Sequence, residues 1–432
     1  MSAAIADALV VGGGPAGLAA AIALRQHGRS AIVLERGSYR GPRVGEHLSE
    51  RGRQALDRLG FAVSDEHRRA SEVRSVWGDD HVQSRHSLLS TVGDALHLSR
   101  PLFDEQLAHH ARANGVTVHR DAPVHGVERV GDRWRVTCAA GAFHADVVID
   151  ATGRAARVAR RLGARSIALD SLQAAVAYLD LDSGSHVQVE ACEHGWWYSA
   201  GLAGGRTIAA WMFDREQALR TPEAAWRAAL AHAPHTRARL GAVSPRRFLL
   251  RDARTRRLIP TSGRDWLAIG DAAAALDPLS SSGLGRALDD GWKAAAAIAS
   301  TDDPGFAGYQ RHRHRQQAFT AFLLQRAQVY RAEMRFAHAS FWRCRHRRLP
   351  HEQSLSLSAT GLLEANGDVA PPADMLALFG VDPASILALA QRPRPAHTLA
   401  DALRREHALG DRDAVLAVQY LRDTGALRSP VH

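Results

Sequence analysis

Three glycines near the N-terminus have the spacing of a turn that binds a diphosphate. Gly12, Gly14 and Gly17 fit the pattern GxGxxG, directly after an apolar run and before a helical one. Glycine permits a tight turn, and the helix that follows presents unpaired N–H groups to a negative charge. Glu35 ends the next apolar run, about 20 residues further on, where a carboxylate can accept hydrogen bonds from a ribose 2′-hydroxyl. These residues predict a dinucleotide whose adenosine ribose has no 2′-phosphate.

Both NAD and FAD satisfy this turn, so a second signal has to distinguish them. It comes from Gly270 and Asp271, which end the apolar run 266–269. This pair resembles the second FAD signature of the group A flavin monooxygenases, in which the aspartate hydrogen-bonds the ribityl chain. The segment 278–285 resembles the loop of that family that lays backbone N–H groups under the pyrimidine edge of the flavin. Such donors stabilise negative charge on the reduced ring.

Other segments follow in the order that the family shows. The run Arg-Val-Gly-Glu at 43–46 resembles the RxGE segment of flavin-dependent halogenases and related monooxygenases. Arg100, Asp104 and Leu107 match the R-x3-D-x2-L helix of the family, whose arginine lies near the flavin. The run 150–154, Asp-Ala-Thr-Gly-Arg, resembles the third family element, a strand that ends near the adenine.

The resemblance covers about residues 5–345 and implies one FAD site assembled from distant segments. The residues that we expect to contact FAD are Gly12, Gly14, Pro15, Ala16, Gly17, Glu35, Arg36, Arg43, Glu46, Arg100, Thr152, Gly153, Asp271, Pro278, Gly283 and Leu284. No metal site is expected, because the three cysteines are far apart and form no CxxC pair. Their spacing also argues against a disulfide framework and fits a reducing compartment.

The branch of the family is indicated by what the sequence lacks. Flavin-dependent halogenases carry a lysine in the N-terminal half and a W-x-W-x-I-P motif. This chain has no lysine before Lys293, and its nearest counterpart to the motif is the run 196–201, Trp-Trp-Tyr-Ser-Ala-Gly. Aromatic hydroxylases of group A carry a D-G pair after the third strand that helps to place NADPH, but here the run 152–155 is Thr-Gly-Arg-Ala. The reductant is expected to be NADH or NADPH, or reduced flavin supplied by another protein.

Three segments resemble most closely the flavoproteins that mature quinone-cofactor oxidases. They are Gly195–Ser199, the turn Asp277–Ser280, and the pattern Y-x2-E…FW between Tyr330 and Trp342. Those relatives, among them the maturation protein of lysine oxidase and the monooxygenase of quinohaemoprotein amine dehydrogenase, hydroxylate a tryptophan in a partner polypeptide. The resemblance implies an FAD-dependent monooxygenase in which reduced flavin and O2 form a C4a-hydroperoxide. That species would hydroxylate an aromatic group, either a tryptophan of a peptide or protein partner, as a post-translational modification, or an aromatic small molecule.

Aromatic residues in the second half of the chain are the expected substrate contacts. They are Trp196, Trp197, Tyr198 and Trp211, which could sandwich an aromatic ring. No catalytic residue can be named, because the histidines of the first insertion, at 81, 86 and 97, carry no distinguishing pattern. Two other enzyme classes stay open, a halogenase and a C=C reductase of the geranylgeranyl-reductase type. A further alternative is a flavoprotein scaffold that binds a partner without catalysis.

The predicted elements form an α/β fold with a two-dinucleotide-type Rossmann domain that binds FAD. Residues 1–75, 98–165 and 262–300 are assigned to this domain, and 76–97 with 166–261 to an inserted antiparallel sheet for the substrate. Residues 301–350 are expected to be helical, with an amphipathic helix over 316–339. Residues 351–432 are expected to form a small winged-helix-like module. This module is interpreted as a DNA-binding unit, a unit that docks a peptide or partner, or a stabilising cap.

Composition limits the remaining possibilities. The chain has 432 residues and a formal net charge of +10. The basic residues are almost all arginine, without a nucleic-acid module around them, so no nucleic-acid partner is expected. The N-terminus has no basic region followed by a cleavage site, and no run of about 18 apolar residues occurs. We therefore expect a cytoplasmic protein without a transmembrane segment.

Overall fold

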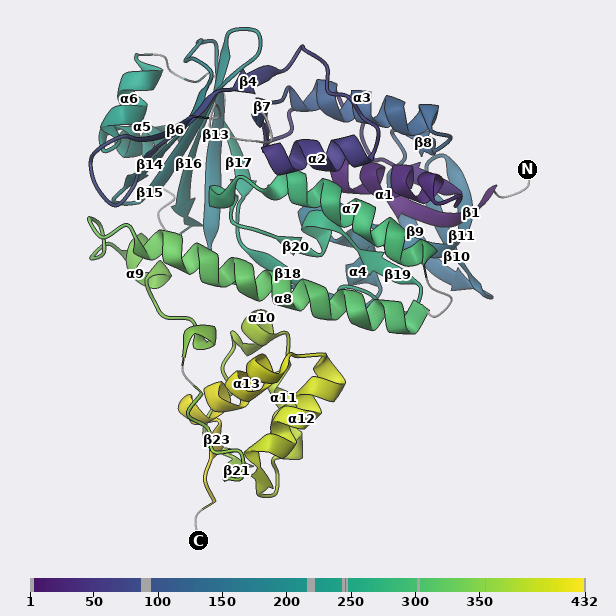
Figure 1. The fold of residues 1–432 in the computed structure, drawn as a ribbon, viewed down its shortest axis with the longest axis vertical. Helices are drawn as coiled ribbons and strands as arrows, with labels where there is room; N and C mark the ends of the chain where they lie inside the picture. Colours follow the sequence, from purple (N-terminus) through teal and green to yellow (C-terminus); the bar gives the residue numbers. More distant parts are fainter. Residues whose placement is uncertain are drawn as a thin grey trace.

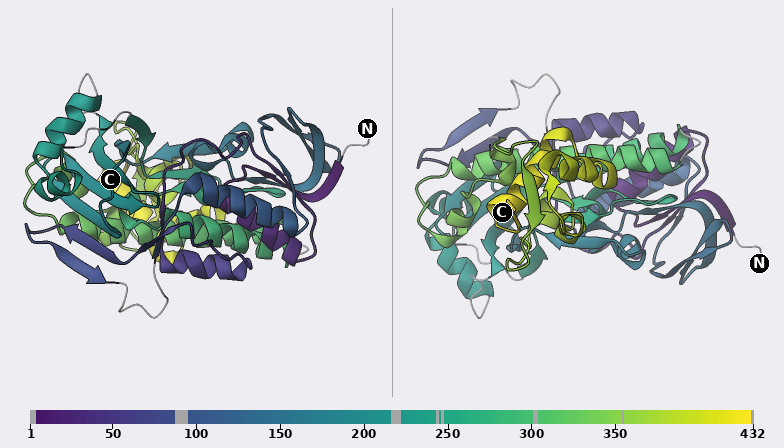
Figure 2. Two further views of the ribbon diagram at one scale, coloured as in Figure 1. Left: turned by 90° about the horizontal axis from the view of Figure 1, so that it is seen from above. Right: turned by 90° about the horizontal axis from the view of Figure 1, so that it is seen from below.

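The computed structural model describes residues 4–86, 95–215, 222–242, 245, 248–300, 304–353 and 355–430. A main body holds two large sheets, and a smaller helical unit follows at the C-terminal end of the chain (Figure 1). Seen from below, this unit lies across the middle of the main body (Figure 2). None of the helices in these ranges has the length and apolar character needed to cross a bilayer.

The first large sheet is built around β1 (Ala4–Val11). This strand pairs in parallel with β2 (Ala31–Leu34) on one side and β11 (Gly141–Asp150) on the other. The sheet continues through β8 (Thr117–His119) beyond β2, and β19 (Trp266–Ala268) pairs in parallel with β11. The C-terminal half of β1 is buried, as expected for a parallel strand that is covered on both faces. The pairing of β19 with β11 therefore brings a segment near residue 270 into the same sheet as the N-terminal strand β1.

Helices pack against one face of this sheet, and two antiparallel strands extend it. The strands are β9 (Val124–Val130) and β10 (Arg133–Cys138). The helices that share a hydrophobic core with β1 are α1 (Pro15–Gln26), α2 (Glu50–Arg58), α3 (Arg100–Ala113) and α7 (Gly283–Ala299). The helix α7 crosses α1 closely, because a Cβ atom at Gly291 would lie 2.3 Å from the carbonyl oxygen of Ala16. The glycine turn at the beginning of α1 is thus held between the sheet and α7.

The second large sheet is mainly antiparallel. Its strand order is β17 (Phe248–Asp252), β13 (Leu172–Leu179), β16 (Arg206–Asp214), β15 (Gly195–Leu202), β14 (His186–Cys192), β5 (Glu72–Val76) and β6 (Gln83–His86). One face packs against α5 (Pro222–Ala231) and α6 (Pro234–Leu240). The other face contacts Val44 and Leu279 of the main body and α9 (Ser340–Arg345). We call it the inner face.

Two small sheets join these parts. One is β3 (His47–Leu48), β7 (Ala95–His97) and β4 (Arg68–Ala70), and the other is β12 (Arg165–Ala168), β18 (Arg256–Ile259) and β20 (Ala274–Ala275). Both small sheets contain strands at which the chain passes from the first large sheet to the second, or back (Figure 1). In the chain, β3 follows the segment 43–46, and β20 precedes the loop 278–285.

A long helix, α8 (Pro304–Arg331), runs along the main body (Figure 1). A helix was expected over 316–339, but α8 ends at Arg331 and α9 begins only at Ser340. The end coincides with contacts to the strand-rich insertion: the indole N–H of Trp77 donates to the carbonyl of Val329 at 2.8 Å. The carboxylate of Glu333 accepts the backbone N–H of Gly78 at 2.8 Å. The helix therefore stops where these tertiary hydrogen bonds replace its own.

The C-terminal unit has four helices and a three-stranded sheet among its described residues. The helices are α10 (Met375–Phe379), α11 (Pro383–Leu389), α12 (Ala396–His407) and α13 (Asp411–Asp423), and the sheet is β22 (Arg394–Pro395), β21 (Leu362–Ala365) and β23 (Leu427–Arg428). Its core is continuous with Leu276, Phe319 and Leu323 of the main body. The unit is thus packed against α8.

A buried histidine in this contact predicts acid sensitivity. His351 stacks on Phe379 with ring centroids 4.6 Å apart, and neither of its ring nitrogens has a hydrogen-bond partner among the described residues. Burial lowers the pKa of His351 to about 4. A histidine with a lowered folded-state pKa contributes stability that is full above its unfolded pKa of about 6.5 and is lost as pH falls toward 4. We expect stability to fall by roughly 2–3 kcal/mol between about pH 6.5 and 4.5 from this residue.

Urea unfolding at several pH values measures this loss. Phenylalanine at this position, in His351→Phe, keeps the stacking and cannot titrate, so the acid-induced loss should shrink. The matched control is His338→Phe, because His338 is exposed and contacts only Glu193 in the described structure. Equal pH dependence in all three proteins would show that His351 does not titrate at the contact.

Candidate functional site

The glycine turn has the geometry that a bound diphosphate requires. Gly12 has a φ of +110°, and a Cβ there would lie 2.3 Å from the carbonyl oxygen of Ala151. A Cβ at Gly17 would lie 2.0 Å from the carbonyl oxygen of Gly12. At Gly14, by contrast, a Cβ would meet nothing within 4 Å. Two glycines therefore close the turn against β11, while the third leaves open space beside it.

The N-terminus of α1 faces the same open space. Gly14 is the N-cap residue, Pro15 is at the beginning of the helix, and no side chain in the described part of the chain caps the N–H groups. Unpaired N–H groups and the positive end of the helix dipole favour an anion at this position. The turn and the helix therefore fit the diphosphate of a dinucleotide such as FAD.

Glu35 is fixed beside the turn. The carboxylate is 6% exposed and accepts the backbone N–H of Gly13 at 2.7 Å and that of Gly37 at 3.0 Å. The hydroxyl of Tyr39 donates to the carbonyl of Gly13 at 2.9 Å and closes this arrangement. A carboxylate held at the end of β2 in this way suits the adenosine ribose of a dinucleotide. The neighbouring Arg36 is exposed.

An ion-pair network joins Glu35 to two more of the expected residues. Arg43 donates to Glu35 at 3.1 Å and to Asp104 at 3.0 Å. Asp104, fully buried on α3, also accepts two hydrogen bonds from Arg100, at 3.1 and 3.2 Å. Arg100 in turn donates to the carbonyl of Gly45. The segment 43–46 and the α3 arginine are therefore one unit, which the sequence predicted only as separate matches.

The segments around Thr152 and Asp271 meet on the other side of the turn. Asp150 is fully buried and accepts the backbone N–H and the hydroxyl of Thr152, at 2.9 and 2.7 Å. Arg154 lies 3.7 Å from the carboxylate of Asp271. A Cβ at Gly270, whose φ is +57°, would lie 2.9 Å from the Cβ of Ala16. The structure therefore places Thr152, Gly153, Ala16 and Asp271 around one helix N-terminus.

A buried network fixes the loop that contains Pro278, Gly283 and Leu284. Asp277 accepts the backbone N–H of Leu279 at 3.0 Å, the hydroxyl of Tyr330 at 2.8 Å and Nε of Arg326 at 2.8 Å. Arg326 also donates to Asp170 at 2.8 Å. These contacts give a structural reason for the Asp-Pro-Leu-Ser turn and for the tyrosine of the Y-x2-E pattern.

Two members of this network were not expected from the sequence. Arg326 and Asp170 lie 156 residues apart, and nothing in their local sequence marks them. The network also reaches the second sheet, because the indole N–H of Trp196 donates to the hydroxyl of Tyr330 at 3.0 Å. The loop after Asp277 and the second large sheet are thus connected through the phenol of Tyr330.

The four expected substrate residues do not lie on one wall. Trp196 and Tyr198 are on the inner face of the second sheet. Trp197 and Trp211 are on the opposite face, in the core under α5 with Trp226, whose ring centroid is 4.5 Å from that of Trp197. Neighbouring residues of a strand point to opposite faces, so Trp196 and Trp197 cannot contact the same ring. The sandwich of all four aromatic residues is therefore not formed.

The inner face carries a second tyrosine that the sequence analysis missed. Tyr178 lies on the same face of β13 as Ala174 and Val176. The opposite face carries Ala175 and Ala177 and is apolar too, so no local pattern marks Tyr178 as inward. Tyr178 packs against the same hydrophobic cluster as Tyr198, Val44 and Leu279. Tyr178 and Tyr198 are both half-buried, so they are the aromatic side chains of this face that remain partly accessible next to the FAD segments.

The position of Trp197 gives a testable expectation. Trp197→Phe should lower the free energy of unfolding by about 1–3 kcal/mol, because it leaves a cavity under α5. The affinity for an aromatic substrate should stay within about twofold, whereas Tyr198→Leu, on the inner face, should weaken that affinity with little loss of stability. Urea unfolding and substrate titration of both variants check this. A large change of affinity in Trp197→Phe at unchanged stability would contradict the placement.

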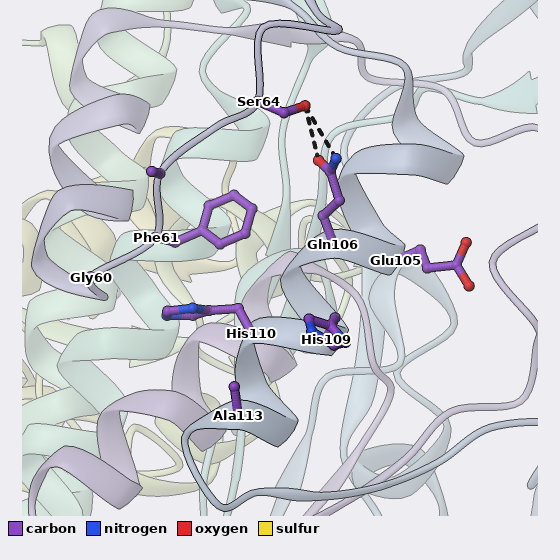
Figure 3. Close-up of a pocket in the computed structure, with 9 residues that line it drawn as sticks. Gly60, Phe61, Ser64, Glu105, Gln106, His109, His110 and Ala113 are labelled. Carbon is purple, nitrogen blue, oxygen red and sulfur yellow. Dashed lines mark hydrogen bonds between the residues drawn. The ribbon is translucent and has the colours of Figure 1, made fainter.

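A pocket of about 680 Å³ lies elsewhere, between the segment 60–64 and the solvent-facing side of α3 (Figure 3). It is lined by Gly60, Phe61, Ala62, Ser64, Glu105, Gln106, His109, His110 and Ala113. Ser64 and Gln106 are hydrogen-bonded to each other at its rim. None of the residues expected to contact FAD or substrate lines this pocket, so it is separate from the candidate site.

The fold and the glycine turn are those of an FAD-binding protein, and the similarity to known proteins agrees with this class. The chain belongs to the family described as the FAD binding domain, whose model matches residues 5–320. It is therefore an FAD-dependent oxidoreductase. A curated relative with this activity in its name is LodB of Marinomonas mediterranea, which is 27% identical over 359 residues that cover 79% of this chain and 96% of the relative.

Two solved structures share the fold over nearly the whole chain. The flavin-dependent halogenase CmlS superposes with a TM-score of 0.72 at 20% identity and covers 99% of this chain and 96% of its own. QhpG, named as a peptidyl tryptophan dihydroxylase essential for tryptophylquinone cofactor biogenesis, superposes with a TM-score of 0.66 at 22% identity. That match covers 98% of this chain and all of the other. At these identities the similarity establishes the fold, with parallel and antiparallel sheets as expected.

Proposed function

We propose that this protein is an FAD-dependent monooxygenase that hydroxylates an aromatic ring, and that its substrate is a tryptophan side chain of a peptide or protein partner. The observation that carries the proposal is the pair Tyr178 and Tyr198 on the inner face of the second sheet. The two strands that carry them are separated by β16 alone, with Tyr178 opposite Ile208 and Tyr198 opposite Ala210, so the tyrosines stand about 12 Å apart across the sheet. Between them lie buried apolar side chains, Ile208 and Ala210. An aromatic ring fits such surroundings.

The chain's own residues would hold FAD beside this face. The uncapped N-terminus of α1 and the open space at Gly14 would bind the diphosphate, Glu35 the ribose, and Asp271 the ribityl chain. The loop fixed by Asp277 would provide backbone donors to the flavin ring. Bound FAD would supply two-electron redox chemistry and the activation of O2. NADH or NADPH is the proposed reductant, with reduced flavin from another protein as the alternative.

Relatives support the choice of substrate class. QhpG acts on a peptidyl tryptophan according to its name, and its similarity extends through the C-terminal unit of this chain. We propose that this unit, packed on α8, contributes to docking of the partner polypeptide. Halogenation is the less favoured reading, because the single lysine, Lys293, lies on α7 and pairs with Asp289 rather than facing the second sheet.

The test is turnover of a series of substrates by purified holoenzyme with NADH or NADPH and O2. The series contains free tryptophan, N-acetyl-tryptophanamide, a tryptophan peptide and a coexpressed tryptophan-bearing partner, each with and without chloride. We expect mass spectrometry to find added oxygen, most rapidly on the polypeptides, and no chlorine. Chlorinated product would favour the halogenase, and anaerobic reduction of an apolar C=C substrate would favour the reductase.

A further inference from the structure

A carboxyl group without an ion-pair partner is buried between the FAD segments and the inner face. Glu46, expected among the FAD contacts, is 3% exposed, and its Oε1 accepts the hydroxyl of Tyr178 at 2.5 Å. Its Oε2 accepts the backbone N–H of Gly45 at 2.8 Å. Both carboxylate oxygens are thus engaged within the protein, and one of them is bonded to a tyrosine of the substrate face.

The charges around Glu46 leave it able to exchange a proton. The nearest cation, Arg100 of α3, pairs with Asp104 and also donates to the carbonyls of Val44 and Gly45. No ion pair reaches Glu46 from any part of the chain that the structure describes. The phenol of Tyr198 on β15 and, on the side of Tyr178, Arg251 of β17 are the other titratable groups that face the pair. Burial raises the pKa of Glu46 and that of Tyr178.

Tyr178 is the member of the pair that a substrate can reach. It is half-buried on the inner face, and its hydroxyl proton is already directed at Glu46. A hydroxyl that donates one hydrogen bond can still accept another on its oxygen. An indole held between Tyr178 and Tyr198 could therefore donate its N–H to the hydroxyl oxygen of Tyr178. The proton of that hydroxyl is already donated to Glu46.

We propose that Tyr178 and Glu46 form a proton relay that takes the N1–H proton of an indole substrate during hydroxylation. This inference rests on the proposed function. The N1–H bond breaks as Tyr178 Oη accepts the proton, the Tyr178 O–H proton passes to Glu46 Oε1, and the electron pair stays on the indole. The ring becomes a better donor to the electrophilic oxygen that O2 supplies at reduced FAD. The carboxylic acid would return its proton to N1 through Tyr178. The proton that the oxygenated ring carbon loses would go to the second oxygen atom of O2, which leaves as water, with NADH or NADPH supplying the two electrons.

The relay requires the carboxylate form of Glu46, so the rate of indole oxygenation should rise with pH through a pKa above the ordinary value of a glutamic acid. Tyr178→Phe should lower the rate roughly 100-fold or more, the range that a positioned acid–base group contributes. Glu46→Gln should lower it similarly and remove the acid limb of the pH profile. The matched control for Glu46→Gln is Glu128→Gln, because Glu128 accepts from Arg135 at 3.2 Å on the exposed side of β9, away from every proposed binding residue. Its activity should be unchanged.

The decisive comparison uses N-acetyl-tryptophanamide and its 1-methyl analogue, which has no N1–H proton. Wild type and Tyr178→Phe should oxygenate the methylated compound at the same rate, because the relay has no proton to take. An equal loss in Tyr178→Phe on both compounds would overturn the relay, since it would show that the phenol acts only by packing.

Infrared titration of the holoenzyme provides a readout that does not depend on turnover. A carboxylic acid band should appear as pH is lowered, vanish in Glu46→Gln, and titrate at higher pH in Tyr178→Phe, because the carboxylate loses a donor. If the band titrates at the same pH in Tyr178→Phe as in the wild type, the relay is overturned. If wild type oxygenates no indole at all, the proposed function fails, and the infrared titration alone decides whether the pair exchanges protons.

Discussion

Replacing Gly14 with alanine is expected to weaken FAD binding without unfolding the protein. The new methyl group would meet no protein atom within 4 Å, so the fold has room for it. It would instead occupy the space beside the uncapped N-terminus of α1, where the diphosphate is expected. Overpacking of this kind costs about 1–3 kcal/mol, which corresponds to roughly a 5- to 150-fold weaker affinity for FAD.

The measurement is titration of apoprotein with FAD, together with urea unfolding of the apoprotein. Gly367→Ala is the matched control, because a methyl group there also meets nothing within 4 Å but lies in the C-terminal unit. Its FAD affinity should equal that of the wild type. Unchanged affinity in Gly14→Ala would mean that the diphosphate does not bind at this turn.

Replacing Arg326 with methionine is expected to destabilise the protein strongly. Arg326 is the only cation that the described residues place against Asp277, whose side chain is 1% exposed, and it also pairs with Asp170. Removing one member of a buried ion pair leaves the other uncompensated and costs about 3–5 kcal/mol. Because Asp277 also fixes the N–H of Leu279, the flavin loop should loosen and the absorbance band of bound FAD should change shape.

Urea unfolding of holoenzyme, followed by flavin fluorescence, measures both effects. Arg120→Met is the control, because Arg120 pairs with Glu105 on the surface, and an exposed pair contributes about 0–1 kcal/mol. A loss in Arg326→Met as small as that of the control would show that the network does not hold the loop.

The nucleotide-binding half could be predicted from the sequence because its signals are local. The turn from Gly12 to Gly17 lies within one strand–turn–helix unit, and the strand before Gly270 is a short apolar run. The position of Glu35 follows from the length of the same unit. In each segment the local backbone conformation limits which residue fits, as the positive φ of Gly12 does, so the residue type itself indicates the conformation.

The polar connections could not be predicted, because their partners are far apart in the chain. Glu46 and Tyr178 are 132 residues apart, and Arg43 and Asp104 are 61 apart. The segments were recognised one at a time, and only the fold shows which side chains share a proton or a charge. The end of α8 could not be predicted either, because it depends on contacts with Trp77 and Gly78, which are distant in the chain.

The substrate face was partly predictable. Alternation along a strand separates Trp196 from Trp197 without any knowledge of the fold. The sequence does not show, however, that β16 lies between β13 and β15, or that α5 covers the outer face. Tyr178 could not have been selected from β13 alone, because that strand is apolar on both faces. Its role depends on Glu46, which only the tertiary structure places beside it.

The central claim is that this FAD-dependent oxidoreductase transfers one oxygen atom from O2 to an indole. The most direct measurement is incubation of reduced holoenzyme with a tryptophan peptide under oxygen-18 gas, followed by mass spectrometry of the peptide. We expect one oxygen-18 atom on the tryptophan ring for each hydroxylation, and none when the label is in the water. Label from water, or consumption of O2 without any change of the ring, would contradict the account.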